Sequence, residues 1–110
     1  MLITISKRTK ENIIQIYKYI AKNSIKYANE TVNNIYSLIN YLEHSPYLGR
    51  YVPEVKDKRL REVLYKSYRI VYTVSEKTNT VYIHFVLHGK RDFTSYYNSY
   101  ISKNDIQDFL

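Results

Sequence analysis

The chain has 110 residues, a length typical of one domain and sufficient to bury a single hydrophobic core. It contains no cysteine, which excludes disulfides, thiolate catalysis and cysteine-ligated metals and fits a cytoplasmic protein. Seventeen Lys and Arg against ten Asp and Glu give a formal net charge of +7, which indicates either a polyanionic partner or a surface that only maintains solubility.

The first half of the sequence predicts a short strand followed by two helices. Residues 2–5 have the composition of a strand and form too short an apolar run for a signal peptide or a membrane span. Ser6 and Ser24 stand where helix N-caps belong. Apolar side chains then recur at steps of three and four, which predicts two amphipathic helices packed as an antiparallel hairpin. The repeating positions are Ile13, Ile16 and Ile20 in the first helix, and Ala28, Val32, Ile35, Ile39 and Leu42 in the second.

The second half predicts a loop and a group of strands. Pro46 and Gly49 end the second helix, and residues 45–59 are expected to form a loop. Polar breaks at 66–67 and 76–79 separate three strand-like runs, which predicts antiparallel hairpins. These runs are Leu60 to Tyr65, Tyr68 to Ser75 and Thr80 to His88, and in the last one Val81, Ile83, Phe85 and Leu87 are expected to share one apolar face.

Beyond the last strand, Phe93, Tyr97 and Tyr100 are spaced as on a short C-terminal helix. The element order β-α-α-β-β-β predicts an α+β fold, in which the helical hairpin packs on an antiparallel sheet. We expect residues 1–110 to form one domain.

The histidines and acidic residues show no pattern of an enzyme site. His84 and His88 lie four apart in a predicted strand, so about 13 Å would separate them, too far for one metal ion. We therefore expect no metal site and no cofactor. Glu54, Asp57 and Glu62 are predicted to act mainly as ion-pair partners for Arg59 and Arg61.

Arginines in the strands are the most informative polar residues. Arg61, Arg69 and Arg91 lie within or at the ends of adjacent strand-like runs, where a guanidinium is costly to bury alone. A guanidinium matches phosphate oxygens with a planar fork of donors. We expect Arg61 and Arg69 to share one sheet face, with Lys90 and Arg91 at its far end, as an anion site. The alternative is that these arginines form salt bridges at the sheet rim.

Several short motifs stand in order along the chain. They are Ile20-Ala21 before the helix that contains Ala28, Pro46-x-x-Gly49-Arg50, Leu60-Arg61-Glu62, Tyr68-Arg69-Ile70-Val71-Tyr72 and His88-Gly89-Lys90-Arg91-Asp92. At these spacings the set resembles the RelE/ParE toxins of bacterial type II toxin–antitoxin systems, from about residue 2 to residue 97.

The resemblance implies a toxin that an acidic, partly disordered antitoxin inhibits in a hetero-oligomer away from the membrane. Two mechanisms stay open. RelE-like members are mRNA interferases, endoribonucleases that enter the ribosome, cleave mRNA and so inhibit translation. ParE-like members inhibit DNA gyrase. We expect the first, with gyrase inhibition as the alternative and a non-catalytic nucleic-acid-binding or inactive relative as a second alternative.

In the RelE-like interpretation, the resemblance assigns catalytic roles to Arg69, Arg91 and Tyr97. The two arginines would stabilise the pentacovalent phosphate, and the tyrosine would help to deprotonate the ribose 2′-OH without a metal. An unperturbed tyrosine pKa near 10 is too high for this task unless nearby cations lower it. The remaining candidates, for binding the anionic substrate, are Arg61, Lys90 and His88.

Overall fold

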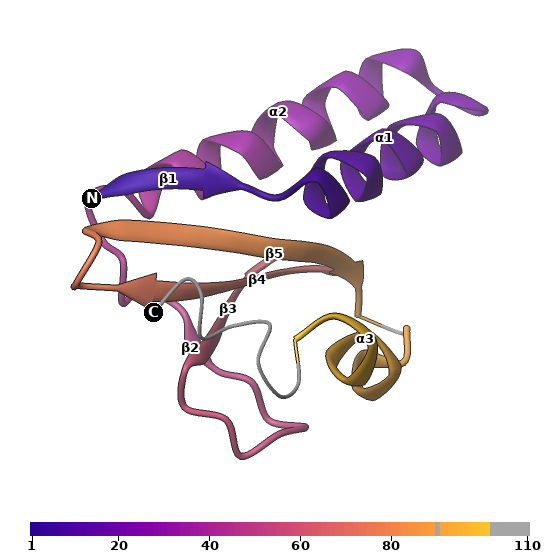
Figure 1. Ribbon diagram of the computed structural model, residues 1–110. Helices are drawn as coiled ribbons and strands as arrows, with labels where there is room; N and C mark the ends of the chain where they lie inside the picture. The colour runs from indigo at the N-terminus through magenta and orange to yellow at the C-terminus, as the bar shows by residue number, and fades with distance from the viewer. Residues whose placement is uncertain (90, 102–110) are drawn as a thin grey trace.

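The structure is a computed structural model that describes residues 1–89 and 91–101. It confirms the predicted α+β fold, in which a helical hairpin lies on one side of a sheet and a short C-terminal helix lies on the other (Figure 1). In chain order the elements are β1 (Leu2–Ile5), α1 (Lys7–Ala21), α2 (Ile25–Tyr41), β2 (Arg50–Tyr51), β3 (Leu60–Tyr65), β4 (Tyr68–Ser75), β5 (Thr80–His88) and α3 (Phe93–Tyr100). The three long strands have the predicted bounds.

The sheet has the strand order β1-β5-β4-β3-β2. β3–β4 and β4–β5 are antiparallel hairpins as predicted, and the first turns through Lys66 at a φ of 51°. β1, however, pairs with β5 in parallel, so the prediction of a wholly antiparallel sheet is wrong. The reason is that the chain between these strands crosses over through the helical hairpin. β2 was also missed, because two residues inside a polar loop give no periodic signal.

The start of α1 is fastened to β5 by hydrogen bonds. Ser6 is the predicted N-cap: its Oγ accepts a hydrogen bond from the Thr9 amide at 3.0 Å. The same hydroxyl donates to the His84 carbonyl at 2.8 Å, and the Thr9 hydroxyl donates to the Ile83 carbonyl at 3.1 Å. Farther along the helix, Asn12 accepts from the Val86 amide at 3.1 Å. These bonds fix the position of α1 over the sheet.

We expect Ser6→Ala to lower the free energy of unfolding by about 2 kcal/mol, because it removes a cap and leaves a buried carbonyl without this donor. Ser24, which caps α2 through a solvent-exposed hydrogen bond, is the matched control. Its alanine variant is expected to cost about 1 kcal/mol or less. Urea unfolding of both variants measures the difference, and equal losses would show that the bond from Ser6 to β5 contributes nothing.

The sheet has a core cluster on each face, and a β-bulge in β5 changes which of its side chains enter each cluster. Tyr72 pairs with Ile83, and its neighbour Val71 pairs with Phe85, so His84 is an extra residue between the two pairs. The extra residue reverses the alternation of side chains along β5, so Val81 and Ile83 point to one face and Phe85 and Leu87 to the other. The prediction that these four side chains share one face is therefore wrong. The cluster under the helical hairpin contains Ile13, Ile35, Ile39, Leu42, Val63, Ile70, Tyr72, Val81, Ile83 and Val86. The cluster on the other face contains Val52, Leu60, Val71, Phe85, Leu87, Phe93 and Ile101.

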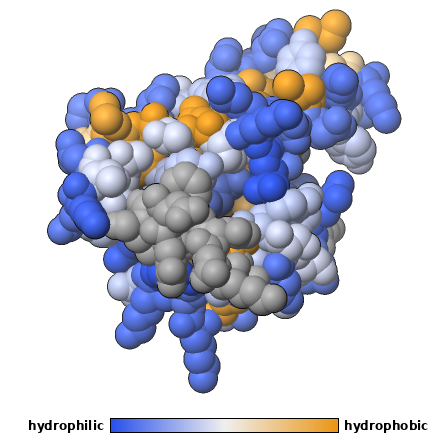
Figure 2. All heavy atoms as spheres, viewed as in Figure 1, coloured by the Kyte–Doolittle hydropathy of each residue, from blue (hydrophilic) through white to orange (hydrophobic). Residues whose placement is uncertain are grey.

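The face of the molecule seen in Figure 2 is mainly polar. Figure 2 shows hydrophilic side chains over much of the visible face, with apolar side chains gathered along the helical hairpin. Ile14 and Ile25 are among the large apolar side chains that stay exposed on these helices. Within residues 1–89 and 91–101, no helix combines the length and the apolar character needed to cross a membrane.

Candidate functional site

Arg69 lies on the sheet face that α3 covers, and carboxylates surround its guanidinium. Two of its nitrogens bind Glu54 in a fork at 2.6 and 2.7 Å, and Nε donates to Glu62 at 2.6 Å. The residue is only 7% exposed, and its guanidinium carbon lies 4.9 Å from the centre of the Phe93 ring. The hydrogen bond from Arg69 lowers the pKa of Glu54, and the two carboxylates raise the pKa of Arg69. Arg69 is thus a buried ion-pair centre.

Glu62 joins this centre to the edge of the sheet. Its side chain is fully buried on β3; one carboxylate oxygen accepts from Arg69, and the other accepts from Arg50 Nε at 2.8 Å. Asp57 pairs with Arg59 as predicted, with contacts of 2.8 and 2.6 Å. The predicted pairing of Glu54 and Glu62 with Arg59 and Arg61 is wrong. Both carboxylates bind Arg69, and Glu62 also binds Arg50.

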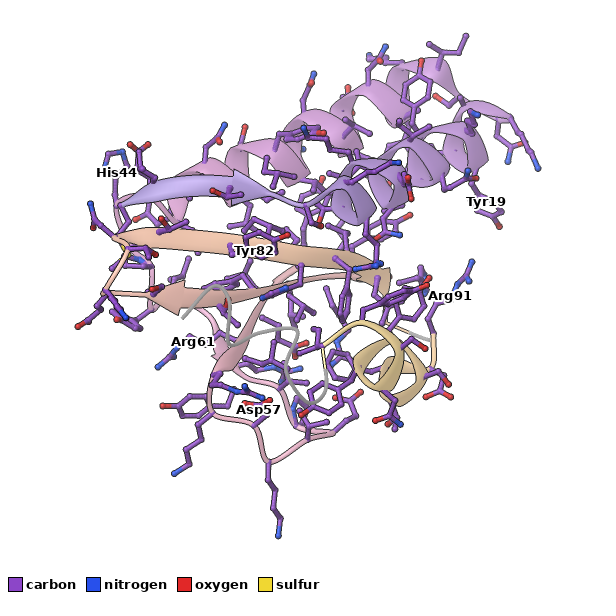
Figure 3. The ribbon with its side chains drawn as sticks, viewed as in Figure 1. Tyr19, His44, Asp57, Arg61, Tyr82 and Arg91 are labelled. Atoms are coloured by element: carbon purple, nitrogen blue, oxygen red, sulfur yellow. The ribbon has the colours of Figure 1, made fainter. Side chains whose placement is uncertain are left out.

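Arg61 lies on the opposite face from Arg69, so the expected sharing of one face is wrong. The β3–β4 register pairs Arg61 with Tyr72 and Arg69 with Leu64, and directly paired residues project to the same side of a sheet. Arg61 donates to the Gly49 carbonyl at 2.8 Å, and its guanidinium carbon lies 5.1 Å from the centre of the Tyr47 ring and 4.5 Å from that of Tyr51. Figure 3 shows Arg61 and Arg91 well apart in the molecule.

Tyr97, on α3, is held by the loop between β2 and β3. Its hydroxyl donates to Asp57 at 2.9 Å, and the same carboxylate binds Arg59. Burial, followed by the hydrogen bond to Asp57, raises the pKa of Tyr97. A general base near neutral pH needs a lowered tyrosine pKa, so this setting is the reverse of an activating one.

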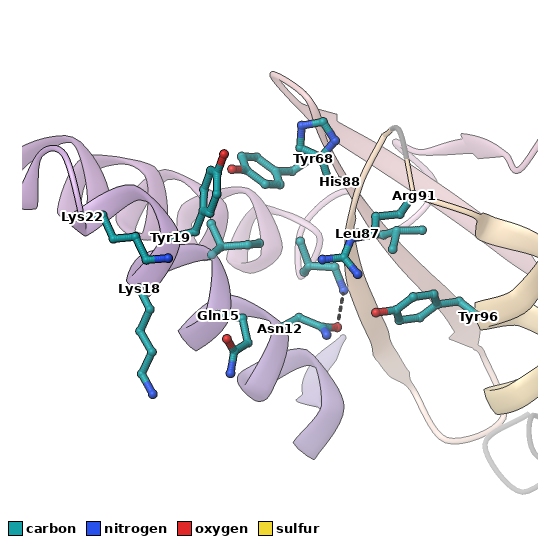
Figure 4. A pocket seen from close by; sticks show the side chains of 12 residues that line it. Asn12, Gln15, Lys18, Tyr19, Lys22, Tyr68, Leu87, His88, Arg91 and Tyr96 are labelled. Atoms are coloured by element: carbon teal, nitrogen blue, oxygen red, sulfur yellow. Dashed lines mark hydrogen bonds between the residues drawn. The ribbon is translucent and has the colours of Figure 1, made fainter.

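Arg91 and His88 line a different region, an open cleft between α1 and the paired ends of β4 and β5 (Figure 4). Arg91 is exposed, and the His88 ring meets the Tyr68 ring edge-on at 5.5 Å. Lys90 lies outside the described residues. Of the predicted site residues, the cleft brings together only His88 and Arg91 among those that the structure describes. Arg61, Arg69 and Tyr97 do not line it.

The α1 wall of this cleft was not predicted from the sequence. Asn12, Gln15, Tyr19 and Lys22 recur at steps of three and four, so they share one side of the helix. That spacing was a usable signal, although the apolar stripe of the same helix is the more conspicuous one. Among the described residues, no three His, Asp or Glu side chains form a group that could hold a metal ion.

The chain is similar to solved structures from toxin–antitoxin systems. The chain is similar to a chain of the chromosomal ParDE system of P. aeruginosa, with a TM-score of 0.66 and 15% identity over 80% of this chain and 95% of that one. It is also similar to a chain of the RelBE2 toxin–antitoxin complex of Mycobacterium tuberculosis, with a TM-score of 0.58 and 13% identity over 79% and 95%. For the isolated E. coli RelE toxin the TM-score is 0.59 and the identity 12% over 99% and 98%. At these identities the likeness shows a shared fold.

A helical hairpin on this sheet defines the class of small toxins with the RelE/ParE fold. The family model "ParE toxin of type II toxin-antitoxin system, parDE" matches residues 3–93, and the chain belongs to this family. It is therefore the toxin of a type II toxin–antitoxin system. A comparison with curated protein sequences gave no match.

Proposed function

We propose that this toxin inhibits DNA gyrase, in the ParE-like manner, and does not cleave RNA. The observation that carries the proposal is the occupation of Arg69 by two carboxylates, Glu54 and Glu62. An RNA phosphate at this guanidinium would have to displace Glu54 and would remain close to the fully buried charge of Glu62. Repulsion between these like charges opposes binding of the scissile group.

Tyr97 supports the same proposal. Its hydroxyl already donates to Asp57, and its pKa is raised, so it is poorly suited to take a proton from a ribose 2′-OH. Arg91 stands in the cleft, away from the carboxylates that hold Arg69 and Tyr97. A nuclease needs these groups at a single phosphate.

Ribosome-dependent mRNA cleavage is the second candidate. It is favoured by the presence of Arg69, Arg91 and Tyr97 at the positions that the RelE resemblance assigns to catalysis. In this case the loop that carries Glu54 and Asp57 would have to leave Arg69 and Tyr97 before RNA binds.

We further propose that an acidic antitoxin holds the toxin in a cytoplasmic hetero-oligomer. The net charge of +7 supports an acidic partner, because opposite charges steer and stabilise association. The similar RelBE2 structure of M. tuberculosis is a toxin–antitoxin complex, and this is consistent with such a partner.

The test separates the two targets in one set of experiments. Purified toxin is added to a gyrase supercoiling reaction on relaxed plasmid, and in parallel to a cell-free translation reaction in which message ends are mapped. We expect loss of supercoiling and intact messages. Codon-linked message cleavage with normal supercoiling would overturn the proposal in favour of the second candidate.

Tyr97→Phe is expected to leave toxicity intact. The variant removes the hydroxyl that binds Asp57 but keeps the ring that stacks on Phe93 and the Asp57–Arg59 pair, so it should cost about 1 kcal/mol of stability. Growth after induced expression measures the effect. A folded Tyr97→Phe protein that no longer arrests growth would assign this hydroxyl to the chemistry.

A further inference from the structure

The open cleft beside Arg91 is not used as a whole by either proposed mechanism. Its volume is about 800 Å³, and it lies between α1 on one side and the ends of β4 and β5 on the other. Cavities of this size accommodate small organic ligands or short polymer segments. Among the described residues, none of those that line it carries a carboxylate. The lining residues that matter here are Lys18, Tyr19, Lys22, Tyr68, Arg91 and Tyr96.

Three basic side chains give the cleft its charge. Lys18 and Lys22 come from α1, and Arg91 comes from the segment after β5; all three are exposed. In Figure 4 the Arg91 guanidinium points into the space between α1 and β5. Since no carboxylate among the described lining residues offsets these charges, the cleft favours an anion with several charged groups.

Three tyrosine rings stand along the same cleft. Tyr19 is 72% exposed, and the Lys22 ammonium lies 5.9 Å from the centre of its ring. Tyr68 is held edge-on by His88, and Tyr96 packs on Phe85 with their centres 5.4 Å apart. Rings that neighbours hold in place beside cations form a surface on which unpaired bases stack.

We propose that this cleft binds a short stretch of single-stranded nucleic acid, with the phosphates on Lys18, Lys22 and Arg91 and the bases on the tyrosine rings. A duplex is a poorer ligand, because its base faces are already stacked on one another. An acidic peptide would pair with the cations but offers no base to stack on the three tyrosine rings.

Binding of nucleic acid in this cleft is a property separate from gyrase inhibition and does not depend on it. The toxin could inhibit gyrase with or without this site, and the site can be tested on the purified chain with neither gyrase nor ribosomes present. Failure of the binding experiment and failure of the supercoiling experiment are therefore distinguishable.

The experiment measures fluorescence anisotropy of a labelled ten-nucleotide oligothymidylate as purified toxin is added. We expect Tyr19→Ala to weaken binding about tenfold, because a base loses its stacking partner. The double variant Lys18→Gln/Lys22→Gln should weaken binding and reduce the salt slope by about 1.4, since each lost phosphate contact contributes about 0.7. Circular dichroism checks that each variant is folded.

A charge-matched control variant distinguishes a site from general attraction. Lys56→Gln/Lys77→Gln removes the same charge from exposed positions that do not line the cleft, and it should retain affinity within about twofold. An equal loss in both double variants would overturn the proposal, as would unchanged binding by Tyr19→Ala. Tighter binding of a labelled decaglutamate peptide than of the oligothymidylate would also overturn the proposal and would indicate an acidic protein as the ligand. Equal affinity for duplex DNA would contradict the stacking of bases on the tyrosines.

Discussion

Arg69→Ala should lower the free energy of unfolding by about 3 kcal/mol. The substitution leaves Glu62 buried with one fewer cation and removes the fork that holds Glu54, and breaking a buried ion pair by deleting one partner costs about 3–5 kcal/mol. The lower end applies because Arg50 still reaches Glu62 at 2.8 Å. Urea unfolding measures the loss. A growth assay alone would misread it, because an unfolded toxin is also harmless.

Two further variants identify the origin of this loss. Arg91→Ala, at an exposed arginine, should change stability by no more than about 0.5 kcal/mol. The free energy of unfolding of the double variant Arg69→Ala/Glu62→Ala should fall by less than the sum of the losses in the two single variants. We expect the difference to be at least about 0.5 kcal/mol, because the two side chains share one interaction. If Arg69→Ala unfolds at the wild-type midpoint yet has lost toxicity, the arginine acts in chemistry and the nuclease candidate returns.

Mild acid should destabilise the protein through His84. Burial, reinforced by the positive charges of Arg8 and Arg59, lowers the pKa of His84 from 6.5 to about 3. The unfolded chain therefore takes up a proton below pH 6.5, whereas the folded protein stays neutral there until about pH 3. Stability falls as the pH drops through this window, by about 2 kcal/mol between pH 7 and pH 5.

Urea unfolding at pH 7 and pH 5 tests this expectation. Glu54 and Asp57 also have lowered pKa values, but their stabilising effect is lost only as the pH falls below their ordinary values of 4.5 and 3.8. His84→Gln, whose amide can still hydrogen-bond Thr73, should be less sensitive to pH by about 2 kcal/mol. His44→Gln, at an exposed position, is the control and should behave as the wild type. Equal pH dependence in all three proteins would contradict the role given to His84.

The positions of the arginines in the sequence predict which strands carry them but not which face of the sheet each one occupies. Arg69 and Arg61 stand in strands that do pair, as the sequence indicates. Which face each one occupies depends on the register, and the register places them on opposite faces. The carboxylate partners of Arg69 come from a loop 15 residues earlier and from the neighbouring strand, so no local pattern reveals them.

Local patterns were enough for most of the elements. Apolar spacing fixed the two helices, Ser6 and Ser24 fixed where they begin, and short polar breaks fixed the three long strands, because each of these signals lies within a few neighbouring residues.

Contacts between distant segments required the tertiary structure. They include the parallel pairing of β1 with β5, the bulge at His84 and the joining of α1 to Arg91 across one cleft. Each is set by how whole elements pack and by which residues meet across the sheet. Shifting a strand by one residue reverses every side chain on it, and nothing within the strand itself records that choice.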